Sequence, residues 1–200
     1  TQGTSEHVMR FILLLAFCGL AFSAFQYTAR LGNPKVPNPV LFSWSVNGTV
    51  LHGQVSWKGN GWVAIGWHPL KSTPTGPKGE GMTYADYILG EFPTGKGVLV
   101  TDRFSPKGNP PAYDTSLGGT DDILEYSGGQ ANGVSMFEFK RLLNTDDSPY
   151  DHPIEEGKYH LIWARADPND PKVKNPNVLS YHGPGVDYTH GNQWVNFMTG

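Results

Sequence analysis

The stretch LFSWSVNGTVLHGQVSWKGNGWVAIGW at residues 41–67 predicts three consecutive β-strands. Asn47-Gly48 lies between the runs Leu41–Val46 and Val50–Trp57, which are rich in β-branched and aromatic residues, and this dipeptide is a strong signal for a β-hairpin. A glycine-rich turn follows, and Trp62–Trp67 forms the third run. This part of the chain therefore predicts an antiparallel sheet.

Short strands separated by turns continue to the end of the chain. Further strands are expected at Ala85–Phe92, Gly97–Phe104, Asp122–Tyr126, Val134–Lys140, Lys158–Ala166, Val178–Tyr181 and Trp194–Met198. Leu31–Pro39 is expected to be an extended lead-in segment, Lys71–Gly81 and Ser105–Thr120 to be loops, and Arg141–Asn144 to form at most one helical turn. About ten strands without a convincing helix predict an all-β, antiparallel β-sandwich.

The composition also favours a β-domain and excludes several classes of protein. Only 16% of the 200 residues are charged and 38% are apolar, and the chain holds 25 glycines, 16 prolines and 12% aromatic residues. Many turn-formers and aromatic residues argue against helical bundles, coiled coils and disordered chains. The net charge is −3 and there is no basic block, so no nucleic acid partner is expected.

Residues 1–24 are typical of upstream residues followed by a secretory signal peptide. Met9-Arg10 precedes an apolar run that begins at Phe11, and Ala21 and Ser23 suit a signal peptidase. The run has about 14 residues and a membrane span needs roughly 20, so we expect cleavage rather than an uncleaved anchor. The sequence therefore predicts a secreted or extracytoplasmic protein, with residues 25–200 as a single domain and no further membrane span.

After residue 24 the chain contains no cysteine, which excludes disulfides and thiolate chemistry from the expected domain. Asn47-Gly48-Thr49 is an N-glycosylation sequon on a predicted turn, so Asn47 is a candidate glycosylation site. The sequence has no nucleophile-elbow or zinc-protease motif. Asp121-Asp122 and Asp146-Asp147 are interpreted as turn residues. No catalytic constellation is found, so we expect a binding or electron-transfer domain rather than an enzyme.

Met82 and His182 differ from the other candidate ligands in their expected positions. Met82 follows a glycine-rich loop and precedes the strand Ala85–Phe92, and His182 follows the expected strand Val178–Tyr181. Residues at such strand–loop junctions can reach a common pocket. His52, His160 and Met136 lie within expected strands and are interpreted as structural.

The order of several motifs resembles the DOMON family. These motifs are the run WVAIGW, a Met shortly before an Asp-containing strand, VTDRF at residues 100–104, KYHLIWARA at 158–166, LSYHGP at 179–184 and VNF at 195–197. The resemblance covers residues 40–198. It implies an immunoglobulin-like β-sandwich that is secreted or extracytoplasmic.

Many DOMON domains hold one b-type haem between a Met and a His, and the resemblance places these roles on Met82 and His182. His190 also precedes the last expected strand and is the alternative to His182. Met/His ligation fills both axial positions of the iron, so the implied function is one-electron transfer. The candidate pocket walls are Trp62, Trp67, Tyr84, Tyr181 and Phe197. A redox protein or a fused redox or membrane domain is the implied partner.

Two other functions fit the same fold. A carbohydrate-binding DOMON module without haem would use exposed aromatic residues near loops, such as Trp62 or Trp194, to stack on sugars. An adhesion or assembly module would present an exposed apolar patch to other proteins. Visible absorption separates the haem hypothesis from both.

Overall fold

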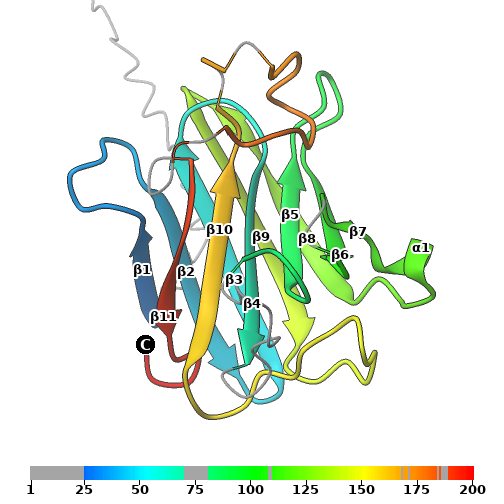
Figure 1. The fold of residues 1–200 in the computed structure, drawn as a ribbon. Coiled ribbons are helices and arrows are strands. Elements are labelled where there is room, and N and C mark those ends of the chain that lie inside the picture. The colour runs from blue at the N-terminus through cyan, green and yellow to red at the C-terminus, as the bar shows by residue number, and fades with distance from the viewer. Residues whose placement is uncertain are drawn as a thin grey trace, which may run out of the picture.

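The computed structural model describes residues 25–69, 81–107, 110–167, 169–170, 172–183, 185 and 189–200. These residues form eleven strands and one short helix: β1 (Tyr27–Leu31), β2 (Val40–Asn47), β3 (Val50–Lys58), β4 (Val63–Pro69), β5 (Asp86–Glu91), β6 (Leu99–Phe104), β7 (Ala112–Tyr113), α1 (Asp114–Leu117), β8 (Ile123–Ala131), β9 (Val134–Leu142), β10 (Tyr159–Arg165) and β11 (His190–Val195) (Figure 1). The expected signal peptide at residues 1–24 and most of the loop Lys71–Gly81 lie outside the described residues. Among those described, no helix has the length and apolar character needed to cross a membrane.

The strands form two antiparallel sheets that face each other, which confirms the predicted β-sandwich (Figure 1). The five-stranded sheet has the order β1-β2-β3-β9-β8, and the six-stranded sheet has the order β11-β10-β4-β5-β6-β7. The β2–β3 hairpin pairs Asn47 with Val50, and Gly48 in its turn has a φ of 59°. The Asn-Gly signal therefore identified this turn correctly, because glycine adopts positive φ without steric cost.

The main hydrophobic core fills the space between the sheets. The five-stranded sheet contributes Phe42, Trp44 and Phe137, and the six-stranded sheet contributes Ile65 and Trp67, all of them fully buried. Alternate residues of β3 are buried, as expected for a strand with one face on the core. Each such side chain stabilises the fold by about 1.5–3 kcal/mol relative to an exposed one.

The six-stranded sheet is apolar on its outer face as well as on its inner face. Every residue of β5 is buried. On β4, Val63, Ile65 and Trp67 belong to the main core, whereas Ala64 packs in a separate apolar cluster. A sheet that buries both faces needs a cover on the outer side, and here chain segments provide it.

The structure differs from the sequence-based expectation at five places. The strand β1 was not expected, because the prolines at 34, 37 and 39 obscure the alternation that precedes them. Val178–Tyr181 is not a strand. The last strand is His190–Val195 rather than Trp194–Met198, and Arg141 and Leu142 end β9 instead of starting a helical turn. The helix α1 lies within the expected loop Ser105–Thr120.

Candidate functional site

A cavity of about 530 Å³ lies on the outer face of the six-stranded sheet. Its floor consists of side chains from three neighbouring strands, namely Leu89 of β5, Ala64 of β4, and Ile162 and Ala164 of β10. Ala64 pairs with both Leu89 and Ala164, so these residues share one face of the sheet. Because Ala64 and Ala164 have small side chains, the floor of the cavity lies close to the sheet. The residues that line the cavity are mostly apolar.

Met82 forms one wall of the cavity. Its side chain packs against a small apolar cluster of Ala85, Tyr87 and Ile162. The Tyr87 hydroxyl donates a hydrogen bond of 2.7 Å to the Met82 carbonyl oxygen. Burial raises the pKa of Tyr87 far above its usual value, so the hydroxyl keeps its proton and this hydrogen bond. The backbone that carries Met82 is thus fixed to the start of β5.

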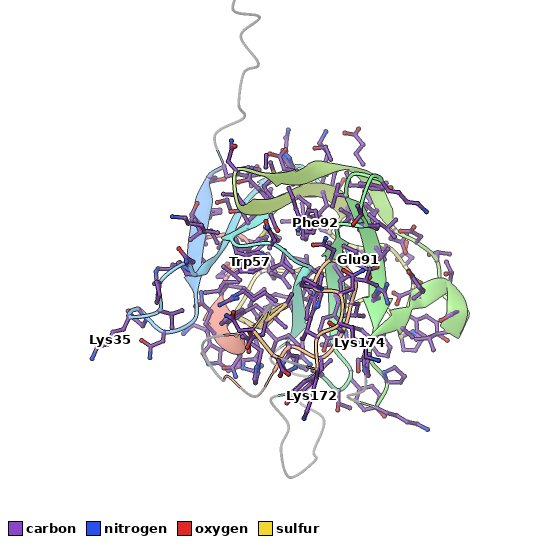
Figure 2. The ribbon with its side chains drawn as sticks, turned by 90° about the horizontal axis from the view of Figure 1, so that it is seen from above. Lys35, Trp57, Glu91, Phe92, Lys172 and Lys174 are labelled. Atoms are coloured by element: carbon purple, nitrogen blue, oxygen red, sulfur yellow. The ribbon has the colours of Figure 1, made fainter. Side chains whose placement is uncertain are left out.

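The segment that contains residues 172–183 covers another side of the cavity. Its backbone is attached to the ends of β4 and β5, because the Trp62 amide donates to the Pro176 carbonyl (2.7 Å) and the Phe92 amide donates to the Asn177 carbonyl (2.8 Å). Figure 2 looks down on this end of the sandwich, with Lys172 and Lys174 on the segment and Glu91 and Phe92 at the end of β5. These contacts hold the segment without strand pairing.

Glu91 connects this segment to the sheet by two polar contacts. Its Oε1 accepts a hydrogen bond of 2.7 Å from the Leu179 amide, and its Oε2 forms an ion pair of 3.1 Å with Arg103. Both side chains are buried, and Arg103 also lies 3.8 Å above the Tyr113 ring. Leu179, Ser180 and His182 line the same cavity, so Glu91 anchors the segment that carries this histidine.

His182 and His190 line the cavity together, and their ring centroids are 4.1 Å apart. The Nδ1 atom of His182 lies 2.8 Å from the Gly183 carbonyl oxygen. A carbonyl oxygen only accepts hydrogen bonds, so Nδ1 carries the proton and Nε2 presents its lone pair. Burial lowers the pKa of His182, which keeps the imidazole neutral at neutral pH.

A comparison with protein-family models matched the DOMON domain over residues 38–166, more than half of the chain. The chain belongs to the DOMON family. The matched region of this DOMON domain includes Met82 and the strands β4, β5 and β10 of the cavity floor, whereas His182 and His190 follow it.

A comparison with solved structures found a likeness to a cytochrome domain. The cytochrome b domain of pyranose dehydrogenase from Coprinopsis cinerea aligns with 84% of this chain and 80% of its own, at 11% identity and a TM-score of 0.49. No curated protein sequence matched this DOMON domain.

Two of the five expected pocket walls line the cavity of the DOMON domain. Trp62 is only 2% exposed and its indole Nε1 donates to Ser180 Oγ (3.3 Å), and Tyr181 lies beside His182 at a centroid distance of 5.3 Å. Both appear in the cavity lining together with Met82, His182 and His190. Residues from distant parts of the sequence thus meet at one place.

The other three expected walls lie elsewhere, which corrects the sequence-based set. Trp67 and Phe197 pack edge-to-face at 5.6 Å in the main core, because odd-numbered residues of β4 point between the sheets. Tyr84 is 48% exposed and its ring lies near Phe104, away from the cavity lining. Asn47, the candidate glycosylation site, is exposed at the end of β2.

The sequence analysis missed the residues of the cavity floor. Ala64, Leu89, Ile162 and Ala164 lie in runs that are apolar at nearly every position, such as WVAIGW and HLIWARA. Such continuous runs indicate strands buried on both faces. That signal was present in the sequence and predicts a covered outer face.

Proposed function

We propose that this DOMON domain binds one b-type haem in the outer-face cavity, with Met82 and His182 as its axial ligands. The proposed function is one-electron transfer outside the cytoplasm. The observation that carries the proposal is that a thioether and a neutral imidazole, from segments far apart in the sequence, line one largely apolar cavity.

The cavity suits a flat, mostly apolar cofactor. Its volume of about 530 Å³ lies in the usual range for ligand pockets, roughly 300–1,000 Å³. Ala64 and Ala164 keep the floor low, so a planar ring can lie against the sheet without displacing core residues. Trp62 and Leu179 belong to one apolar cluster beside the cavity.

The donor set matches the iron of a b-type haem. The carbonyl of Gly183 orients His182, as is usual for metal-binding histidines, and leaves Nε2 to coordinate. Met82 supplies a neutral thioether. When bound between these residues, the haem would cycle between ferric and ferrous iron with both axial positions filled, and Met/His ligation favours the ferrous state.

His190 is the alternative to His182 as the histidine ligand. Its Nδ1 lies 3.4 Å from the Thr189 hydroxyl, which itself donates to the Gly185 carbonyl (3.1 Å). The 2.8 Å contact of His182 Nδ1 with the Gly183 carbonyl oxygen leaves Nε2 of His182 to coordinate. We therefore assign the ligand to His182 and a packing role to His190, whose ring lies against it.

A haem titration of the purified domain tests the ligand assignment. Wild-type protein should bind haem in a 1:1 ratio with a six-coordinate, low-spin spectrum. His182→Ala and Met82→Leu should each lose that spectrum, and His190→Ala should retain it. His52→Ala and Met136→Leu are matched controls, because both residues lie on the five-stranded sheet away from the cavity. Loss of the low-spin spectrum in His190→Ala alone would assign the ligand to His190.

The carbohydrate hypothesis is weakened at one of its two aromatic residues. Trp62 is buried and therefore cannot stack on a sugar at the surface. Trp194 remains accessible at 51% exposure, with the His160 ring at 4.8 Å. A domain that stays colourless with haem and binds oligosaccharides, with the binding lost in Trp194→Ala, would replace the electron-transfer proposal.

The cellular context and the partner belong to the same proposal. We propose that the domain is secreted or lies on the extracytoplasmic face of a membrane, that Asn47 carries a glycan, and that a redox protein or fused redox domain exchanges electrons with it. Exposure of Asn47 at the β2–β3 turn is compatible with glycosylation. Expression in a secreting eukaryotic cell, with and without Asn47→Gln, tests this by the mass of the secreted protein.

A further inference from the structure

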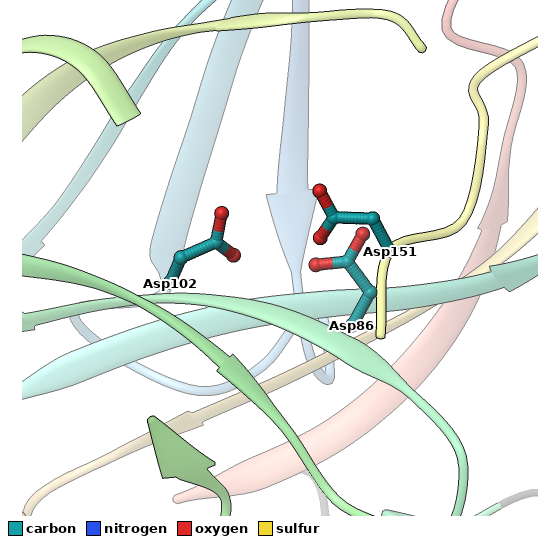
Figure 3. Close-up of side chains that lie close together, drawn as sticks. All are labelled: Asp86, Asp102 and Asp151. Carbon is teal, nitrogen blue, oxygen red and sulfur yellow. The ribbon is translucent and has the colours of Figure 1, made fainter. Parts of the chain in front are cut away.

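A second polar group lies on the opposite face of β5, between the two sheets. Arg141 of β9 contacts Asp86 Oδ2 through Nη1 at 3.0 Å and Asp151 Oδ2 through Nη2 at 2.9 Å. All three side chains are buried. Asp102 of β6 lies next to them, and Figure 3 shows the carboxyl groups of Asp86, Asp102 and Asp151 gathered in one place.

The carboxyl groups in this region exceed the positive charge by a wide margin. Asp86, Asp102 and Asp151 offer oxygen atoms within 4.8 Å of one another, and so do Asp122, Asp147 and Asp151. Asp114 of α1 interacts electrostatically with Asp102, Asp147 and Asp151. We call these residues the carboxylate cluster: Asp86, Asp102, Asp114, Asp122, Asp147 and Asp151. Arg141 is the one guanidinium that pairs with this cluster in the described part of the chain.

Buried members of the cluster, Asp151 among them, have oxygen atoms that accept no hydrogen bond from the described residues. Asp102 is 3% exposed, its Oδ2 accepts a hydrogen bond from the Asp122 amide (3.2 Å), and its Oδ1 accepts none. Asp114 is 1% exposed and neither of its carboxyl oxygens accepts a hydrogen bond. A buried carboxylate without a partner costs several kcal/mol, so these oxygens require a proton or a cation.

We propose that the carboxylate cluster binds one Ca²⁺ ion, with Asp122, Asp147 and Asp151 as its ligands. Six carboxyl groups and no sulfur form the cluster, and such oxygen-only sets suit a hard cation. The nearby imidazole of His152 is directed elsewhere, since its Nε2 lies 2.7 Å from the Tyr84 carbonyl oxygen.

The outer part of the cluster is arranged for entry of an ion from solvent. Asp122 and Asp147 are half-buried, whereas Asp102, Asp114 and Asp151 lie behind them. Thr120 holds both outer carboxylates, because its amide donates to Asp147 Oδ2 and its hydroxyl donates to Asp122 Oδ2, each at 2.7 Å. One oxygen of each carboxylate is thereby oriented, and the other is available to the ion.

Calcium binding at this position would connect four segments of the chain. Asp102 belongs to β6, Asp114 to α1, Asp122 precedes β8, and Asp147 and Asp151 belong to the connection between β9 and β10. An ion that binds only the folded protein stabilises it, and at a concentration of 100 times Kd the melting temperature should rise by roughly 5–10 °C. The ion is therefore a structural one and is independent of the haem proposal.

The test uses the full chain in its haem-free form, after treatment with EGTA. Isothermal titration with CaCl2 should show one site, and CaCl2 should raise the melting temperature of the wild type. Asp147→Asn should weaken binding at least 10-fold. Asp146→Asn is the matched control, because its side chain is exposed and Asn tolerates the positive φ of 61° at this position.

Asp122→Asn provides a second ligand variant should Asp147→Asn fail to fold, with exposed Asp121→Asn as its control. Absence of any calcium effect in the wild type would overturn the proposal and assign protons to the cluster. Equal binding in the ligand variants and their controls would also overturn it, because the ion would then bind elsewhere. Neither result depends on haem, so failure here leaves the proposed electron transfer untouched.

Discussion

The two faces of β5 carry polar groups that are built in opposite ways. Tyr87 and Leu89 point outward to a largely apolar cavity, where Met82 and His182 are neutral donors. Asp86 points inward, where carboxylates surround the buried guanidinium of Arg141. Neutral donors can remain in an apolar cavity at little cost, whereas buried acids require a counter-charge within the fold. The outer site therefore suits an uncharged donor set for a cofactor, whereas the inner site depends on positive charge, which Arg141 supplies in part.

The largest expected effect comes from removing the positive charge on the inner face. Arg141→Ala leaves the carboxylates of Asp86 and Asp151 without their partner in a fully buried position. Loss of one member of a buried ion pair lowers the free energy of unfolding by about 3–5 kcal/mol. Urea denaturation of the variant measures this loss. Lys140→Ala, which removes an exposed pair with Glu125, should change stability little. Equal losses in the two variants would contradict the contrast between the faces.

On the outer face, filling the cavity should affect ligand binding far more than stability. Ala164→Phe places a ring over the floor of the cavity from a half-buried position. We expect haem affinity to fall by about 100-fold or more, equivalent to roughly 3 kcal/mol. Urea denaturation of the haem-free protein should change by less than about 1 kcal/mol. Ala131→Phe, at the exposed end of β8, should bind haem normally. Unaltered haem affinity in Ala164→Phe would place the ligand outside this cavity.

A smaller effect is expected from loosening the segment that carries His182. Glu91→Gln removes the charge that pairs with Arg103 and weakens the contact with the Leu179 amide. Hydrogen bonds to charged groups contribute about 1.5–3 kcal/mol, so we expect haem to dissociate about 10-fold faster. Transfer of haem to excess apomyoglobin measures this rate. Glu155→Gln, at an exposed position, is the control. An unchanged rate would mean that Glu91 does not position His182.

A change of pH tests the inner face without a substitution. The folded protein raises the pKa of Asp102 and Asp114 to about 9, whereas both groups ionise near pH 4 in the unfolded chain. The unfolded chain thus binds fewer protons between these values, and stability falls as pH rises. The window from pH 7 to 9 isolates this effect, because histidines with lowered pKa, such as His182, are neutral there. Melting temperatures in EGTA should decrease over this window, and calcium should have its greatest effect at pH 9.

The sequence predicted the β-sandwich because its evidence is local. Asn47-Gly48 specifies a hairpin turn, and the period-2 pattern of Val50–Trp57 specifies one buried face. The same local reasoning failed at Val178–Tyr181, because Leu179 packs against the cluster of Trp62 and Ala64 without any strand partner. Apolar alternation does not distinguish a strand from an irregular segment that covers a cavity.

The candidate site was only partly predictable for a related reason. Met82 and His182 could be named from motif order. Whether Trp67 points into the cavity or into the main core depends on which face of β4 the odd-numbered residues occupy. Asp86 and Arg141 are separated by many residues, and only the packing of β5 against β9 brings them together. Neither the inner face nor the cavity floor can be assigned without knowing which strands are neighbours.

The absorption spectrum of the haem-reconstituted domain, before and after dithionite, decides whether Met82 and His182 hold a haem. We expect a low-spin spectrum whose Soret band sharpens and shifts on reduction, with resolved α and β bands. That spectrum should disappear in His182→Ala and persist in His52→Ala. A wild-type protein that remains colourless after haem is added, or a His182→Ala variant with the wild-type spectrum, would contradict the account.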